Sequence, residues 1–197
     1  RVRRLDAVAL AHQRDDAAET VVLRLARGGG AAGLGGMRPK GVLNGVTLIR
    51  PLLDIGRDTL REWLRAHRHE WREDASNGDL SILRNRVRHS VLPALRAAFG
   101  PAVNATLARS ADLLREDDAV LEERAAAVLD EARAAGAVAA ARLLAEPEAI
   151  RRRAVYRWLL QEAGAAAATF AAVKRVLEKV EAGGEWQVAA ATVIEVG

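Results

Sequence analysis

The chain has 197 residues, of which 50% are hydrophobic and 28% charged, and this ordinary globular composition excludes wholesale disorder. It contains no cysteine, which excludes a disulfide framework, a thiolate zinc site and a cysteine nucleophile, and fits a reducing compartment. A formal net charge of +4 permits a polyanionic partner but is modest. The apolar runs are far shorter than the ~20 residues of a membrane span. We therefore expect a cytoplasmic protein that does not enter a membrane.

The first part of the chain predicts a strand that passes directly into a helix. Residues 5–11 form a short apolar run that ends at His12, and the following acidic residues open a segment with apolar side chains at helical spacing. Such a junction is typical of α/β domains. The glycines at 28–30 should end the helix and begin a mobile loop to Gly36. Next, two apolar runs separated by Asn44 and Gly45 predict a β-hairpin.

The rest of the chain is predicted to be mainly helical. Pro93 should bend or restart one of the helices, and Gly100 with Pro101 suggests a domain boundary. The tail from Trp186 to Val196 alternates weakly and predicts a small hairpin. Helices are predicted at 57–67, 83–99, 102–135, 147–164 and 169–181. The fold class is thus an α/β part followed by a mainly α-helical domain with a small terminal β-hairpin.

Three acidic residues follow His12 at the strand-to-helix junction, where open α/β sheets usually bind ligands. Asp16 and Glu19 share a helical face, and Asp15 lies beside them. Such a cluster can hold a magnesium ion, a substrate ammonium group, or both. A structural interpretation competes, because Asp16 with Glu19 fits a capping box and acidic residues complement the dipole of a first helical turn. The residues alone leave both interpretations open.

A basic stretch follows later in the chain, with no acidic residue inside it. It contains Arg84, Arg86, Arg88, His89 and Arg96. Positions 84 and 88 share a helical face, and a guanidinium can bind phosphate or carboxylate in a bidentate manner. The alternative is a solvated basic face.

Other features have a structural interpretation beside the functional one. Trp63, Trp71, Trp158 and Trp186 are expected to anchor the core rather than to stack on nucleic-acid bases. The glycine-rich segment 27–37 lacks a Walker pattern, and either a lid or a plain flexible connection fits it.

The motifs form an ordered series that resembles the tRNA(Ile)-lysidine synthases, a family of PP-loop ATP pyrophosphatases. Each motif is weak alone, but their order over residues 12–93 is not expected by chance. The series consists of His12 to Thr20, Arg27 to Gly30, Gly33 to Met37, Arg50 to Leu53, Glu73 to Asn77 and Arg84 to His89. The helical remainder resembles the family less distinctively, through residues 147–153.

The resemblance implies a ligase that joins L-lysine to the wobble cytidine of tRNA(Ile) with a CAU anticodon. In that family ATP adenylates the base, and the lysine ε-amine then displaces AMP. ATP is thus implied as a substrate and Mg²⁺ as a cofactor. Ala17 departs from the family, where a glutamine commonly follows the acidic pair.

The resemblance also implies roles for individual residues. The expected catalytic residues are His12, Asp15, Asp16 and Glu19. Asp16 and Glu19 would bind lysine, Arg84 would bind substrate or phosphate, and Asp15 would lie at the magnesium ion. Arg27, Arg86 and Arg88 would contact the tRNA.

Members of the superfamily carry a Ser-Gly-Gly-x-Asp-Ser loop near their start, and this sequence has none. The expectation is therefore a fragment that lacks the N-terminal PP-loop of a Rossmann-like nucleotide domain and is inactive alone. Residues 1–99 would be the C-terminal part of the adenylation domain, and residues 100–197 a helical tRNA- or substrate-binding domain. Two alternatives are another PP-loop tRNA-modifying enzyme, which the lack of cysteine disfavours, and a non-catalytic tRNA-binding module. A homodimer is an open expectation.

Overall fold

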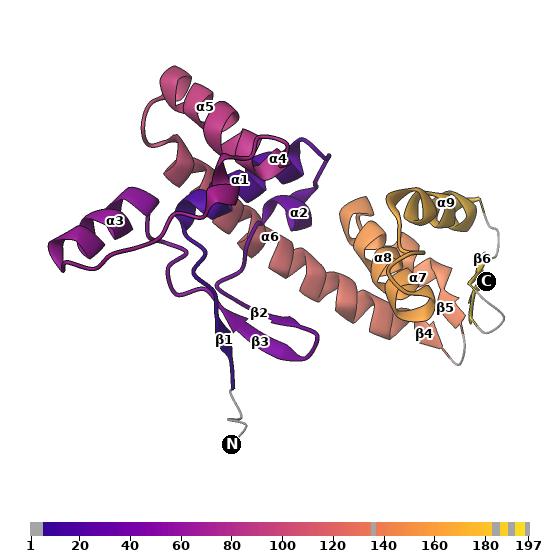
Figure 1. The fold of residues 1–197 in the computed structure, drawn as a ribbon. Helices are drawn as coiled ribbons and strands as arrows, with labels where there is room; N and C mark the ends of the chain where they lie inside the picture. The colour runs from indigo at the N-terminus through magenta and orange to yellow at the C-terminus, as the bar shows by residue number, and fades with distance from the viewer. Residues whose placement is uncertain (1–5, 135–136, 183–185, 189–191, 196–197) are drawn as a thin grey trace. The chain divides into compact units, whose positions relative to one another are not determined.

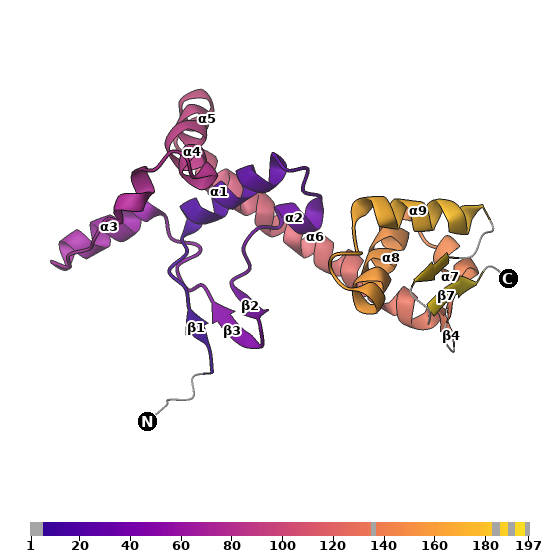
Figure 2. The same ribbon diagram turned by 45° about the vertical axis from the view of Figure 1, so that its right-hand side comes forward.

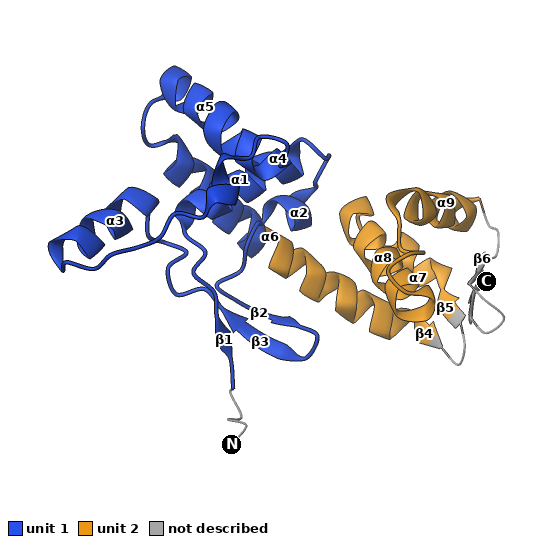
Figure 3. Cartoon of the chain, viewed as in Figure 1, with its two compact units in different colours: residues 1–116 blue, residues 117–197 orange. Residues whose placement is uncertain are grey.

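A computed structural model describes residues 6–134, 137–182, 186–188 and 192–195 (Figure 1). The chain divides into two compact units, residues 1–116 and 117–197 (Figure 3). The division falls inside the long helix α6, Val103–Ala132, whereas the sequence places a boundary at Gly100 and Pro101. This Gly-Pro pair separates two helices, but it does not end the compact unit. The assignment of domains to functions stays a prediction.

Unit 1 contains a small mixed sheet. Its strands are β1 (Val8–Ala9), β2 (Lys40–Leu43) and β3 (Val46–Ile49), in the order β1-β3-β2. The pair β1 and β3 is parallel, and β2 and β3 form the predicted antiparallel hairpin. Asn44 and Gly45 have φ of 50° and 78°, the left-handed conformation that a two-residue hairpin turn of type I′ requires. None of the residues in these strands is buried.

The helices of unit 1 form its core. They are α1 (Arg14–Leu25), α2 (Ala31–Leu34), α3 (Arg57–Ala66), the 3₁₀ turn η1 (Ala75–Gly78), α4 (Leu83–Arg86), the π-helical turn η2 (Val87–Val91), α5 (Leu92–Phe99) and the first part of α6. Ala18, Val87 and Leu92 are buried together, with Leu95 and Leu107 packed against them. The short helix α2 lies within the segment that the sequence predicts as a loop, so that prediction is wrong for Ala31–Leu34.

The predicted helix 83–99 is broken in the middle by η2. Pro93 has no N–H to donate to the carbonyl of His89, and its ring crowds that carbonyl. The chain widens to a π-helical turn just before the proline, and Leu92 N–H bonds to the carbonyl of Val87. Helix α5 then begins with the proline in its first turn. The prediction that Pro93 bends or restarts the helix is confirmed.

Helix α3 has ten residues, and none of them is buried. Figures 1 and 2 show it projecting from the other helices of unit 1. As a result Trp63 and Trp71 are 52% and 37% exposed, and the prediction that they anchor the core is wrong. The sequence misled because the apolar stripe of a helix normally faces a core.

The described residues of unit 2 share one apolar core. Beside the second part of α6 it contains α7 (Ala140–Leu144), α8 (Glu148–Ala163), α9 (Phe170–Glu181) and strands β4 (Arg133–Ala134), β5 (Ala137–Ala139), β6 (Trp186–Val188) and β7 (Thr192–Glu195). Trp158 is 1% exposed and anchors this core, as predicted. The side chain of Trp186 and the residue Val196 lie outside the described part.

The sheet of unit 2 has the order β4-β5-β7-β6. Strands β6 and β7 are antiparallel, which confirms the predicted terminal hairpin over its described residues. The sequence predicts a helix from 102 to 135, whereas α6 ends at Ala132 and β4 follows. Pairing of β4 with β5 replaces the last residues of the predicted helix. The sequence did not predict this strand, because the alanine-rich segment carries no local signal for one.

Candidate functional site

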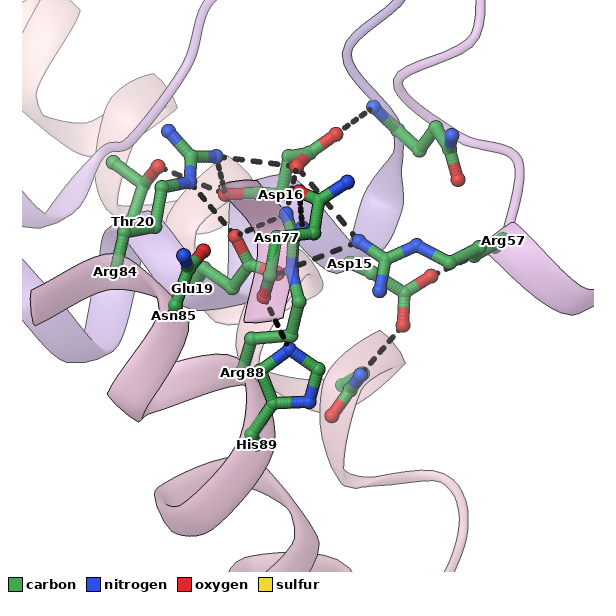
Figure 4. Close-up of polar contacts among 12 residues, drawn as sticks. Asp15, Asp16, Glu19, Thr20, Arg57, Asn77, Arg84, Asn85, Arg88 and His89 are labelled. Atoms are coloured by element: carbon green, nitrogen blue, oxygen red, sulfur yellow. Dashed lines mark hydrogen bonds and ion pairs between the residues drawn. The ribbon is translucent and has the colours of Figure 1, made fainter. Parts of the chain in front are cut away.

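The acidic motif lies where β1 leads into α1. Asp16 is the third residue of the helix, and its Oδ2 accepts a hydrogen bond of 2.9 Å from the backbone N–H of Gln13. This contact gives Asp16 a capping role, but with Gln13 at the cap position and not in the box with Glu19 that the sequence leaves open. Its other oxygen, Oδ1, points toward arginine side chains, so Asp16 has ionic contacts in addition to the cap (Figure 4).

Five charged side chains form one cluster, which we call the acid–arginine cluster: Asp16, Glu19, Arg57, Arg84 and Arg88 (Figure 4). Glu19 is fully buried at its centre. Its Oε1 accepts a bond of 2.6 Å from Arg88 Nε, and its Oε2 accepts one of 2.8 Å from Arg84 Nε. Asp16 Oδ1 lies 3.2 Å from Arg84 Nη2 and 3.3 Å from Arg88 Nη2. Three guanidinium groups thus surround two carboxylates, and the cluster has a surplus of positive charge.

The surroundings keep Glu19 ionised. Burial raises the pKa of its carboxyl, but hydrogen bonds from Arg88 and Arg84 and their charges outweigh burial, so that the pKa lies below its ordinary value. The hydrogen bond to Glu19 in turn raises the pKa of Arg88. The two residues therefore form a stable ion pair in the interior of unit 1.

Asp15 points away from this cluster toward α6. Its Oδ2 accepts a bond of 2.8 Å from the backbone N–H of Arg57, and its Oδ1 accepts bonds of 2.7 Å from Asn104 and 3.2 Å from Arg96. Burial raises the pKa of Asp15, yet these donors bring it below its ordinary value. Both oxygens face N–H groups.

This donor set does not fit the predicted magnesium ion. Both oxygens of Asp15 already accept hydrogen bonds, and among the described residues no group of three or more Asp, Glu or His side chains is placed to hold a metal. The magnesium ligand at Asp15 stays a prediction, which these contacts do not support. Hydrogen-bond donors from α3, α5 and α6 occupy the place of a cation instead.

His12 lies before α1 beside Arg50. Arg50 Nε donates a hydrogen bond of 3.3 Å to His12 Nδ1. Burial, followed by smaller contributions from Arg50 and Arg84, brings the pKa of His12 below its ordinary value, although Asp16 acts in the opposite direction. Because Nδ1 accepts this hydrogen bond, the neutral imidazole carries its proton on Nε2.

A polar cavity of about 430 Å³ adjoins the acid–arginine cluster. Asp16, Arg57 and Arg88 line it from the cluster, and Trp71, Glu73 and Asn77 are among the residues that line it from the segment after α3. Trp71 Nε1 donates a bond of 3.0 Å to Glu73, which also pairs with Arg61. Asn77 Oδ1 accepts a bond of 2.9 Å from Arg88. The cavity thus has both acidic and basic groups on its wall.

Comparison with known proteins shows what this chain is similar to. Residues 2–95 match the family model of the PP-loop domain. A tRNA(Ile)-lysidine synthase of Azoarcus sp. (strain BH72) is 43% identical over 177 residues, which cover 89% of this chain and 39% of the relative. One of Salinispora tropica is 43% identical over 148 residues, which cover 75% of the chain and 44% of the relative. One of Solibacter usitatus is 45% identical over 114 residues, or 58% of the chain and 25% of the relative.

The chain is a homologue of the tRNA(Ile)-lysidine synthases. The resemblance drawn from the ordered motifs and the α/β-then-helical fold class are confirmed. The chain spans less than half of the length of these curated relatives. In the part of the chain that the structure describes, no helix is long and apolar enough to cross a membrane.

Within this lysidine synthase homologue, the structure separates the predicted site residues. Asp16, Glu19, Arg84 and Arg88 meet in the cluster, and Asp15 and His12 lie next to it with partners of their own. Arg88 was predicted to contact tRNA, but it points inward to Glu19 and Asp16. Arg27 and Arg86 are exposed and take no part in the cluster.

The sequence does not predict Arg57 or Asn104. Arg57 is 38 residues from Glu19, and Asn104 is 89 residues from Asp15. Neither residue stands in a motif, so only the fold brings them to the site. For Arg57 a weak signal exists, since it starts a helix directly after the Arg50 to Leu53 motif.

Proposed function

We propose that this chain is part of a tRNA-modifying ligase that uses ATP to attach L-lysine to the wobble cytidine of tRNA(Ile) with a CAU anticodon. The new bond joins carbon and nitrogen, and the cytidine is first adenylated. The observation that supports this proposal is the acid–arginine cluster with its cavity, inside the stretch that matches the PP-loop domain. The cytoplasm stays the predicted location.

The cavity has the charges that free lysine requires. L-lysine carries one carboxylate and two ammonium groups at neutral pH. Asp16 and Glu73 can accept hydrogen bonds from ammonium groups, and Arg57 or Arg88 can bind a carboxylate. Asp16 keeps 13% of its side chain exposed, so it reaches the cavity.

Glu19 has a different task in this proposal. It is fully buried, and both of its oxygens accept hydrogen bonds from arginines. We assign it the positioning of Arg84 and Arg88, whereas Asp16 contacts lysine. We assign to Arg84, one third of whose side chain is exposed, the offsetting of negative charge on the departing AMP. His12 and Asp15 remain predicted site residues, and no step is assigned to a metal.

The test is a chimera with the synthase of Azoarcus sp. The 177 aligned residues of that relative are replaced by the corresponding residues of this chain. We expect ATP-dependent incorporation of labelled lysine into isoleucine tRNA with a CAU anticodon, and its loss in Asp16→Ala. Glu70→Ala, an exposed acidic residue outside the cavity lining, is the matched control and should keep activity.

Two results would contradict the proposal. Chimeras that bind tRNA but incorporate no lysine would indicate a different modification or a binding role. Equal incorporation by the parent chimera and Asp16→Ala would remove Asp16 from the lysine site. Measurement of lysine affinity beside turnover separates a binding defect from a chemical one.

A further inference from the structure

Three aromatic rings gather at the exposed C-terminal end of α3, and we call them the aromatic shelf: Trp63, His67 and His69. The rings of Trp63 and His67 are stacked, with centroids 4.1 Å apart and planes 24° apart. His69 lies at 6.0 Å from Trp63 with a similar tilt of 22°. Trp63 is nevertheless 52% exposed. The rings are therefore ordered by one another while much of the indole surface faces solvent.

The end of the helix holds these rings in place. His67 Nδ1 lies 2.8 Å from the carbonyl oxygen of Trp63, one turn earlier. Arg68 has a φ of 56°, the left-handed conformation that usually requires glycine. This turn allows His69 N–H to bond to the carbonyl of Leu64 at 2.9 Å, which returns the chain over the helix. A non-glycine residue in this conformation costs free energy, and such strain is often retained at functional positions.

Arginines are interleaved with the exposed rings of this segment. From position 65 to 72 the chain has three arginines, Arg65, Arg68 and Arg72, against one glutamate. The guanidinium carbon of Arg65 lies 5.2 Å from the centroid of the Trp71 ring, which is itself 37% exposed. Exposed rings interleaved with arginines are what single-stranded nucleic acid binds, since bases stack on the rings and phosphates pair with the guanidinium groups.

We propose that the aromatic shelf binds an unpaired nucleobase of RNA by stacking on Trp63. A purely apolar partner would not match the arginines, and duplex RNA keeps its bases inside the helix. Leu64 of α3, and Trp71 and Arg72 of the segment after it, also line the cavity of the acid–arginine cluster, so this part of the chain connects the shelf to the candidate active site. The inference rests on the proposed function for the identity of the RNA, which in that function is the tRNA substrate.

The experiment uses the chain itself and two RNA probes. One is a labelled RNA hairpin with an unpaired loop containing CAU, and the other is the same stem closed into a blunt duplex. Dissociation constants are measured by fluorescence anisotropy over a series of salt concentrations for the parent, Trp63→Ala, Trp63→Phe and Phe99→Ala. Phe99 is 76% exposed in the same unit and has no aromatic neighbour among the described ring contacts, so it is the matched control.

We expect Trp63→Ala to weaken binding of the hairpin roughly tenfold, which is the size of one lost stacking interaction. Trp63→Phe should lose less, and Phe99→Ala should bind like the parent. The dependence of the dissociation constant on salt should stay the same in Trp63→Ala, because no phosphate contact is removed. Binding of the duplex should be insensitive to all three substitutions.

The inference is overturned if a folded Trp63→Ala binds the hairpin as the parent does, or if it weakens hairpin and duplex equally. Its outcome is separable from that of the proposed function. If the chimera incorporates lysine and Trp63→Ala has no effect on hairpin binding, only the proposal for the aromatic shelf is refuted. A tenfold loss of hairpin binding without lysine incorporation would leave an RNA-binding surface on a protein of different activity.

Discussion

Glu19 is a buried carboxylate whose charge depends on the arginines around it. Without Arg88, the nearest partner of Glu19 would be Arg84. Part of the negative charge of the carboxylates would then be left unpaired in the interior. We expect Arg88→Ala to lower the free energy of unfolding by about 3 kcal/mol, as for other broken buried ion pairs. Arg86→Ala, at an exposed neighbouring position, should change it by less than about 0.5 kcal/mol. Urea denaturation of both variants measures the difference, and equal effects would contradict a stabilising role of the inward-facing guanidinium.

The lowered pKa of Glu19 also predicts how stability depends on pH. A carboxyl whose pKa is lower in the folded state stabilises the fold fully above its unfolded pKa, near 4.5, and loses this contribution as the pH falls toward its folded value. Glu19→Gln should therefore be destabilised strongly at neutral pH, and the gap to the parent should narrow below about pH 4.5. Denaturation midpoints from pH 3 to pH 7 (~1-unit steps) test this. A gap that is constant over the whole range would show that Glu19 is not held ionised by its partners.

At the residue scale, sequence reasoning found the pairs that lie on one helical face. Asp16 with Glu19, and Arg84 with Arg88, each follow from spacing, and the structure brings these pairs together. Sequence reasoning did not predict that the acidic pair binds the arginine pair, because 65 residues separate Glu19 from Arg84. The partners of Asp15 were not predicted for the same reason, since Asn104 comes from α6.

The end of α3 shows how a single backbone conformation shapes an element. Arg68 adopts a positive φ, for which glycine has no steric cost. Arg68→Gly should raise the free energy of unfolding by roughly 0.5 kcal/mol, because relief of about 1–3 kcal/mol of strain outweighs about 0.4–1 kcal/mol of added chain entropy. Glu62→Gly, within the regular part of α3, should lower it by about 1 kcal/mol instead. Thermal unfolding followed by tryptophan fluorescence compares the two, and a loss of stability in both would refute the strain.

Elements with strong local signals were predicted well from the sequence, and those that depend on distant partners were not. The Asn44-Gly45 turn specifies its hairpin, and Thr169 caps α9 with its side chain. By contrast, β5 pairs with β7, more than fifty residues later, as well as with β4, and no pattern in the local sequence indicates this strand. The exposure of α3 has the same origin, since amphipathic spacing shows which face is apolar and not whether another element covers it.

At the scale of the whole molecule, α6 belongs to both compact units. Its first part carries Asn104, which binds Asp15, and Leu107, which packs on the core of unit 1. Its last part contributes Ala125, Val128 and Leu129 to the separate core of unit 2. Length and composition alone cannot distinguish this arrangement from a boundary at Gly100, because a long helix carries no break at the point where its partners change.

Because each unit has its own core, we expect a substitution in the core of one unit to lower the stability of that unit and not of the other. Leu129 is 1% exposed in unit 2, and Leu129→Ala should lower the stability of that unit by about 3 kcal/mol through loss of buried surface and a residual cavity. Hydrogen exchange should then show weaker protection of amides in α8 and α9, whereas amides in α1 and α5 keep theirs. Leu113→Ala on the same helix, at a position that is 57% exposed, is the control and should change neither set. If Leu129→Ala weakened α1 and α5 as much as α8 and α9, the two units would unfold as one, and α6 would transmit stability along its whole length instead of serving two independent cores.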